Sequence, residues 1–250
     1  SGLVGSEMCI RDRPQLELIR SQLQEGDLLL LSPEFDAAKR QFCTTNAFDD
    51  DFFCMVEENY DLLAPLDLRQ YSGVFSALGS YLQTRAGMAA RSYAISPAEL
   101  DEDGNPVDTP SYNAYGDYIL YRPDAGEDTP IYGLPVDYTV DAFPQAYYID
   151  PANAEIARFK TDGVRVYLTY SPRNSQAVSE ASTPEAIAEL DAYFRENLNA
   201  AILTPLQDSL LPGRYFYGTD NHLSTNGVAL RTAQVITALK DALQKEGLTP

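Results

Sequence analysis

Residues 26–34 read GDLLLLSPE, and this stretch decides the class of fold that we expect. The four leucines from Leu28 to Leu31 form a short, continuously apolar run. Such a run is typical of a parallel strand that is buried on both faces. Ser32, Pro33 and Glu34 then stop the strand sharply, because proline cannot continue it. The loop after this strand is therefore a candidate rim of a ligand site.

Helical and extended patterns alternate outward from this strand. Besides Leu28–Leu31, we expect strands at 164–170 and 215–217, and helices at 15–24, 49–60, 71–91, 152–160, in the segment that opens at Thr183-Pro184, and at 228–243. Residues 94–144 are rich in Pro, Gly and Tyr and predict a long insertion with short hairpins. The alternation predicts a parallel sheet with helices on both faces, whose ligands bind beyond the carboxyl ends of the strands.

The composition predicts a folded protein and argues against some partners. The chain has 250 residues, of which 44% are hydrophobic and 22% charged, which is globular usage. Its formal net charge of −19 would repel nucleic acids and anionic membrane surfaces. The sequence contains no run of about eighteen apolar residues, so it predicts no transmembrane helix. The charge favours solubility and does not name a substrate.

No metal or cofactor is expected from the sequence. Cys9, Cys43 and Cys54 stand at no metal-ligand spacing, and the chain has one histidine, which argues against a zinc site. Cys43 and Cys54 could form a disulfide or remain two reduced thiols, and both alternatives stay open. Residues 101–105, DEDGN, resemble a calcium loop only in part, because the glycine comes too early and no acidic twelfth ligand follows.

The first residues resemble an artefact rather than a natural amino terminus. Leu3 to Arg13 read LVGSEMCIRDR, which resembles the translation of a sequencing adapter. We therefore expect residues 1–13 to lie outside the fold, and the natural protein to begin further upstream. Residues 14–250 are predicted to form a single domain that contains the insertion.

The only histidine, His222, follows the last predicted strand and precedes the last predicted helix. Imidazole has an unperturbed pKa near neutrality, so it suits a general base that takes a proton from a hydroxyl and returns it to a leaving group. A lone histidine is also commonly a surface or capping residue. Position alone leaves both interpretations open.

Three patches of the sequence resemble one superfamily. Residues 215–224, YFYGTDNHLS, resemble the terminal block of SGNH, or GDSL-like, hydrolases, and residues 26–35 and 113–117 resemble segments of an uncharacterised bacterial branch. The resemblance implies a three-layer α/β fold with a parallel sheet of the SGNH (flavodoxin-like) type, here missing its first strands. It also implies a base and an acid that share one loop, which would be His222 and Asp220.

The sequence departs from the family pattern in two respects. The family acid usually lies three residues before the histidine, where Thr219 stands, so Asp220 is one residue closer. The block that carries the nucleophilic serine would precede residue 14, where nothing matches. Ser32 and Glu34 are expected to line the substrate pocket, although a carboxylate cannot donate to an oxyanion. Asn113 is the candidate replacement for the oxyanion-hole asparagine.

The resemblance implies the C-terminal part of a serine esterase or O-acyltransferase that acts on ester-linked acyl groups, with cell-surface glycans as one candidate class. The chain itself is expected to be inactive without its serine. The alternative is a non-catalytic surface or carbohydrate-binding domain with a degenerate hydrolase fold. Localisation and oligomeric state are left open, since any export signal would lie in the missing amino terminus.

Overall fold

The computed structural model describes residues 13–35, 63–64, 68–92, 121–124 and 135–248. The chain divides into two compact units: a sheet unit with residues 1–10, 23–43 and 120–250, and a helical unit with residues 11–22 and 44–119. The predicted helix at 49–60, the three cysteines, the DEDGN segment and Asn113 lie outside the described residues. The assignment of 14–250 to a single domain stays a prediction.

The described helices and strands follow one another in a mixed α/β order. The helices are α1 Arg13–Gln22, α3 Leu68–Ser92, α4 Asp150–Thr161, α5 Pro184–Asn197 and α6 Thr225–Lys245, with short turns of helix at η2 Val140–Ala142, η3 Gln145–Ile149, η4 Leu206–Ser209 and η5 Gly213–Tyr215. The strands are β1 Leu28–Leu31, β2 Arg165–Leu168, β3 Arg173–Asn174, β4 Ala201–Ile202 and β5 Leu210–Leu211.

The helical unit contains α1 and α3, both of which the sequence pattern predicts. In α3, Val74 and Tyr81 are buried, whereas Leu82 is exposed, so the apolar stripe is narrower than its sequence suggests. In α1, Leu16 and Ile19 are buried at helical spacing.

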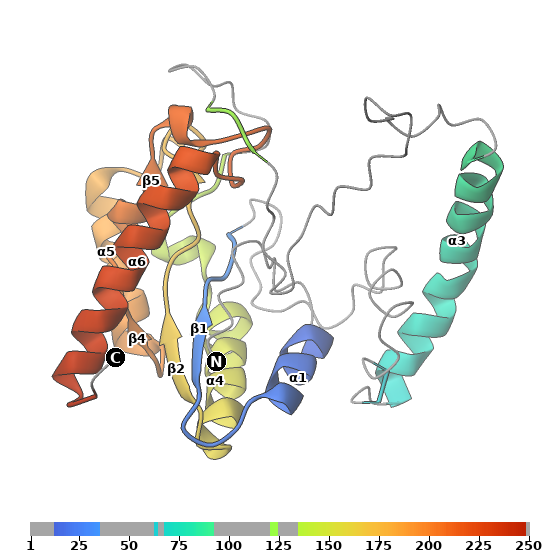
Figure 1. Ribbon diagram of the computed structural model, residues 1–250, viewed down its shortest axis with the longest axis horizontal. Helices are drawn as coiled ribbons and strands as arrows, with labels where there is room; N and C mark the ends of the chain where they lie inside the picture. Colours follow the sequence, from blue (N-terminus) through green and yellow to red (C-terminus); the bar gives the residue numbers. More distant parts are fainter. Residues whose placement is uncertain (1–12, 36–62, 65–67, 93–120, 125–134, 249–250) are drawn as a thin grey trace, which may run out of the picture. The chain divides into compact units, whose positions relative to one another are not determined.

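The sheet unit is built on three parallel strands in the order β1-β2-β4 (Figure 1). Leu28 pairs with Arg165 and Leu31 with Leu168, so β1 and β2 run side by side over their whole length. A second sheet joins β3 to β5, also in parallel. The expectation of a parallel α/β protein is therefore confirmed.

Helices cover opposite faces of the main sheet. Tyr167 of β2 donates its hydroxyl hydrogen to Glu246 Oε1 at 2.7 Å, just after α6, and burial raises the pKa of this phenol to about 12. Leu168, the next residue of β2, lines a small cavity together with Ala152 of α4 and Phe194 of α5. Since successive side chains of a strand point to opposite faces, α6 covers one face, and α4 and α5 cover the other.

The core on the α4 and α5 face is aromatic. The Phe194 ring is fully buried and stacks on Phe35 with centroids 5.8 Å apart, while Phe143 meets Phe194 edge-on at 5.2 Å. Tyr148 and Tyr170 complete the cluster at 5.5 and 6.1 Å from Phe194. This cluster fixes the segment that follows β1, to which Phe35 belongs, against α5.

The predicted boundaries hold for α5 and fail for the third strand. Thr183 caps α5 by accepting the N–H of Ala186 at 3.2 Å, as its place before Pro184 predicts. The strand predicted at 215–217 is wrong. Residues 213–215 form a turn of 3-10 helix after Pro212, and Phe216 makes only an isolated bridge to Leu223.

Candidate functional site

The carboxyl ends of β1 and β2 meet through two serines. Ser171, three residues after β2, donates its hydroxyl hydrogen to the carbonyl oxygen of Ser32 at 2.8 Å. The two hydroxyl oxygens also lie 3.1 Å apart. The structure therefore places Ser32, a predicted pocket residue, at the edge of the sheet where ligands of parallel sheets bind.

Glu34 lies half-buried beyond Ser32, near the phenol of Tyr138. Burial is the main cause that raises the pKa of Tyr138, and the Glu34 carboxylate adds to it. The Arg173 guanidinium acts in the opposite direction on the same phenol. Glu34 and Arg173 are thus both within electrostatic reach of Tyr138, which places the end of β1 close to β3.

The segment that carries His222 is a tight hairpin-like loop. Tyr217 N–H donates to the carbonyl oxygen of His222 at 2.8 Å, and Ser224 N–H donates to that of Tyr215 at 2.8 Å. At its tip, Thr219 Oγ1 accepts the N–H of His222 at 3.0 Å. The imidazole is exposed and, among the described residues, makes no hydrogen bond. It is therefore open to solvent and to a ligand.

Asp220 is buried in the same loop and is held by β3. Its carbonyl oxygen accepts the N–H of Asn174 at 2.8 Å, and its Oδ1 accepts Asn174 Nδ2 at 3.1 Å. Asn174 is itself fully buried. One hydrogen bond of the Asp220 carboxylate thus comes from Asn174 of β3, and among the described residues none joins this carboxylate to the His222 ring.

A second residue of β3 holds the other side of the loop. Arg173 Nη1 donates to Asn221 Oδ1 at 2.6 Å, and Arg173 Nε donates to the carbonyl oxygen of Ala177 at 3.3 Å. The segment from Ser171 to Asn174 thus contacts the end of β1 on one side and the His222 loop on the other. It connects the two predicted parts of the site, Ser32 and His222, through the chain that leaves β2.

The start of α6 is fixed beside His222 by residues 121–124. Ser224 caps the helix by accepting the N–H of Gly227 at 3.2 Å. Arg122 N–H donates to Thr225 Oγ1 at 3.0 Å, and Thr225 N–H donates to the Arg122 carbonyl oxygen at 3.0 Å. Hydrogen bonds from Ser224 and Asn226 lower the pKa of Asp124. The end of the His222 loop that leads into α6 is therefore anchored.

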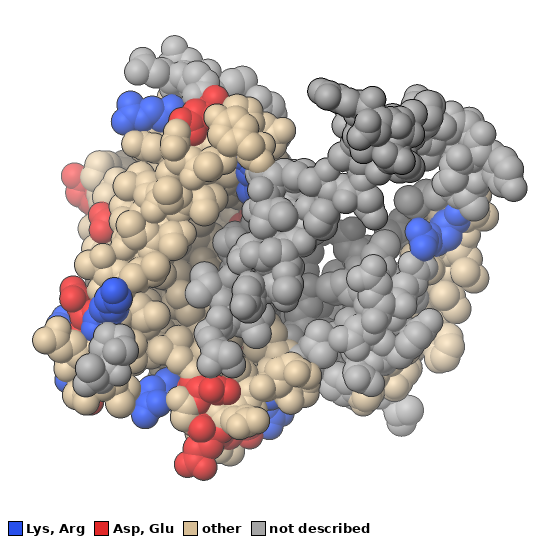
Figure 2. Space-filling view, in the orientation of Figure 1, with Lys and Arg blue, Asp and Glu red and all other residues tan. Residues whose placement is uncertain are grey.

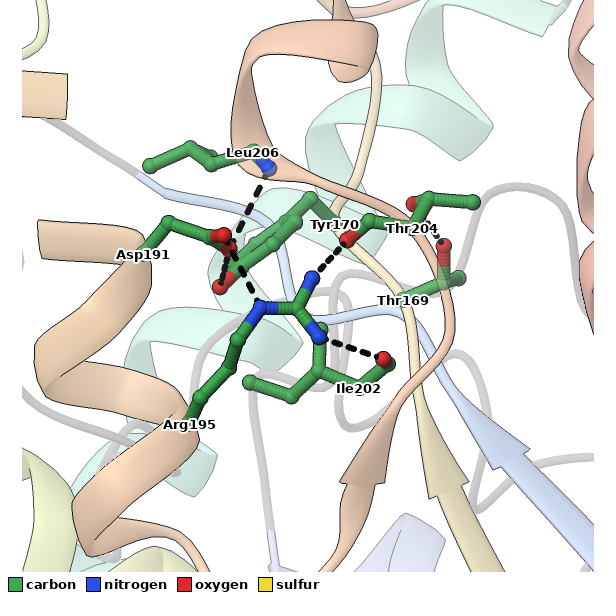
Figure 3. Close-up of polar contacts among 7 residues, drawn as sticks. All are labelled: Thr169, Tyr170, Asp191, Arg195, Ile202, Thr204 and Leu206. Atoms are coloured by element: carbon green, nitrogen blue, oxygen red, sulfur yellow. Dashed lines mark hydrogen bonds and ion pairs between the residues drawn. The ribbon is translucent and has the colours of Figure 1, made fainter. Parts of the chain in front are cut away.

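A separate polar cluster at the end of β4 has a structural role (Figure 3). Asp191 Oδ1 accepts from the Tyr170 hydroxyl at 2.6 Å and the Leu206 N–H at 3.2 Å, and its Oδ2 accepts Arg195 Nε at 2.9 Å. The same guanidinium donates to the carbonyl oxygens of Ile202 and Thr204, at 2.8 Å each. These contacts tie α5 to the chain leaving β4.

No role for Ser171, Arg173 or Asn174 is predicted from the sequence. Their position after β2 could have indicated them, because ligands bind beyond the carboxyl end of a parallel strand, and this rule applies to β2 as it does to β1. Across the described ranges, no group of three or more His, Cys, Asp or Glu side chains could hold a metal ion.

We expect Asn174→Ala to loosen the His222 loop. It removes a buried hydrogen bond to Asp220, so the free energy of unfolding should fall by about 1–3 kcal/mol. Because His222 is the only histidine, its ring resonances in an NMR spectrum report on the loop without ambiguity, and they should shift.

The matched control is Asn153→Ala. Asn153 also makes two bonds across elements, donating to the Asn197 carbonyl oxygen at 2.8 Å and accepting the Asn199 N–H at 2.7 Å. This variant should lose similar stability and leave the His222 resonances in place. Unchanged resonances in Asn174→Ala would show that β3 does not position the loop.

Fold and geometry together define a mixed α/β protein with parallel strands. No family model, curated protein or solved structure matches the chain. None of the helices in the described part of the chain is long and apolar enough to cross a membrane.

Proposed function

We propose that this chain supplies the histidine end of the active site of an SGNH-type serine esterase or O-acyltransferase, and that the nucleophilic serine lies outside it. One observation carries the proposal. The exposed His222 stands on a loop that Arg173 and Asn174 fix to the segment leaving β2, and that segment also contacts Ser32 at the end of β1. A base at this edge of a parallel sheet is placed where a ligand would bind.

In the proposed reaction, His222 is the general base and then the general acid. The imidazole takes the proton of the serine hydroxyl while the serine oxygen bonds to the ester carbonyl carbon. The tetrahedral intermediate then collapses, its bond to the alcohol oxygen breaks, and the imidazolium gives its proton to that oxygen. Water or an acceptor hydroxyl removes the acyl group from the serine by the same steps.

Asp220 is the proposed acid of this pair. Its hydrogen bond from Asn174 fixes the orientation of the carboxylate two residues before the imidazole. The hydrogen bond from the His222 ring to this carboxylate, which would orient the imidazole, would have to form when substrate and serine are in place. Ser32 and Glu34 are proposed to line the acyl or alcohol side of the pocket.

The test compares this chain with a longer form that includes the upstream coding sequence. With p-nitrophenyl acetate as substrate, we expect hydrolysis by the longer form and none by the 250-residue chain. His222→Ala in the longer form should lower kcat by about 1,000-fold or more, because the hydroxyl loses its base. Tyr147→Ala, at an exposed position on η3, is the control and should keep the rate.

Two results would refute the proposal. Hydrolysis by the 250-residue chain alone would show that the serine is not missing. Full kcat in the His222→Ala longer form would show that the imidazole is not the base.

The second candidate is a non-catalytic binding domain with a degenerate hydrolase fold. The observation that favours it is the hydrogen bonding of Asp220 to Asn174 rather than to His222. A longer form that hydrolyses no acyl chromogen, together with retardation of the 250-residue chain in gels containing a polysaccharide, would support this function over the esterase.

A further inference from the structure

A small cavity lies on the α4 and α5 face of the main sheet. Its volume is about 20 Å³. A cavity of roughly 10–15 Å³ already holds a water molecule, so this one has room for a small group. The side chains that line it include Phe35 after β1, Ala152 of α4, Phe194 of α5 and Ile202 of β4.

The wall of the cavity is mainly apolar. Thr169 and Tyr170 also line it, but their hydroxyls have partners elsewhere. The Tyr170 hydroxyl donates to Asp191 Oδ1 at 2.6 Å, and Thr169 Oγ1 accepts from Arg231 Nη2 at 2.9 Å. Water in an apolar cavity loses hydrogen bonds that it makes in bulk, whereas an apolar group loses none. The cavity therefore favours an apolar occupant.

The cavity adjoins the sheet edge where ligands of parallel sheets bind. Pro33 and Tyr170 line it. The residues next to them in the sequence, Ser32 and Ser171, bring their hydroxyl oxygens to 3.1 Å from each other. Pro33 is half-buried, whereas Phe194 on the same wall is fully buried. An apolar cavity and a polar pair thus lie side by side at the carboxyl ends of β1 and β2.

The charge of the molecule restricts the kind of acyl group that suits this place. Figure 2 shows Asp and Glu side chains at several places on the surface of the sheet unit, and the formal net charge of the chain is −19. This field repels an acyl group that ends in a second carboxylate, and an apolar wall makes its desolvation costly. A neutral, apolar acyl group has neither penalty.

We propose that this cavity is the acyl pocket of the site and takes the methyl group of an acetyl ester. The inference rests on the proposed function, which brings the ester to His222. The methyl group enters past Pro33, and the ester carbonyl stays at the sheet edge near Ser32 and Ser171. A longer acyl chain needs further space between the sheet and α5, where close-packed aromatic rings such as Phe194 resist displacement.

The acyl-chain preference of the longer form tests this pocket. We expect kcat/KM for p-nitrophenyl acetate to exceed that for p-nitrophenyl hexanoate by about 100-fold or more, because a misfit of even one methylene costs about 10–200-fold. Leu198→Ala shortens a half-buried side chain of the wall, so it should reduce this ratio by about 10-fold. Leu239→Ala, at a half-buried position on α6, is the matched control and should keep the ratio.

Xenon binding measures the cavity without any activity. Xenon is an apolar atom little larger than a methyl group, and apolar cavities bind it. In the 250-residue chain, dissolved xenon should shift the NMR resonances of Ala152 and Ile202 and leave those of the exposed Val228 in place. Ala152→Leu should abolish the shift at Ile202, because the larger side chain fills the space.

The outcomes separate this inference from the proposed function. If the longer form hydrolyses neither ester, both are overturned. Hydrolysis of the hexanoate as fast as the acetate, or a ratio that Leu198→Ala leaves unchanged, would overturn the acyl pocket alone. An absence of xenon shifts at Ala152 and Ile202 would do the same, and this measurement needs no variant that folds.

Discussion

Phe194→Ala is expected to lower the free energy of unfolding of the sheet unit by about 3–5 kcal/mol. The ring is fully buried in α5, stacks on Phe35 and meets Phe143 edge-on. Truncation removes these contacts, and it also enlarges the small cavity that Phe194 and Leu168 line. The space cannot close easily, because rigid aromatic rings surround it on several sides.

Urea unfolding followed by far-ultraviolet circular dichroism measures this loss. The chain has no tryptophan, so the signal should come from the backbone rather than from one indole. Tyr147→Ala removes an aromatic ring that is 59% exposed, and it should change the free energy by no more than about 0.5 kcal/mol. A loss of under 1 kcal/mol in Phe194→Ala would mean that the aromatic cluster is not packed as described.

The elements that the sequence predicted well are those with strong local signals. Four consecutive leucines predict β1, and Val166, Tyr167 and Leu168 predict β2, because apolar and β-branched runs of this length suit a buried strand. Thr183 and Pro184 predict the start of α5, because capping and a fixed φ act on adjacent residues.

The missed elements depend on distant contacts or are too short to leave a pattern. β4 has two residues, Ala201 and Ile202, and exists only because β2 pairs with it. The aromatic run at 215–217 has strong β propensity, yet Pro212 and Gly213 start a 3-10 turn there. Phe216 is fully buried, so its aromatic character reflects core packing rather than a strand.

Some residues of the candidate site can likewise be predicted from local sequence, and others depend on distant contacts. Position alone draws attention to His222 and Ser32, since each follows a predicted strand. The bonds from Arg173 and Asn174 to the loop join residues 48 and 46 positions apart in sequence, and no local pattern indicates them. The SGNH-type relationship stays a proposal, because a parallel sheet hosts many unrelated functions.

Arg231 of α6 is a buried charge whose removal should be costly. The sequence does not indicate that Arg231 is buried, because it occupies one position of an amphipathic helix. Its Nη2 donates to the Tyr170 carbonyl oxygen at 2.7 Å, to Thr169 Oγ1 at 2.9 Å and to Thr204 Oγ1 at 3.2 Å. Burial lowers the pKa of Arg231 to about 10, and the Asp208 carboxylate opposes this shift. The group is still charged at neutral pH.

We expect Arg231→Ala to lower the free energy of unfolding by about 3 kcal/mol. It leaves the Tyr170 carbonyl oxygen without this donor and creates a cavity between α6 and the ends of β2 and β4. Arg231→Met should cost less, because it fills part of the space and removes the desolvation of a buried cation. Comparing the two variants separates lost packing from lost hydrogen bonds.

The control for this prediction is Arg214→Ala. Arg214 is exposed, and its guanidinium lies 5.1 Å from the centroid of the Tyr215 ring. Its loss should change the free energy of unfolding by no more than about 1 kcal/mol, which is typical of an exposed cation–π contact. Equal losses in Arg214→Ala and Arg231→Ala would show that the buried guanidinium does not hold α6 to the sheet.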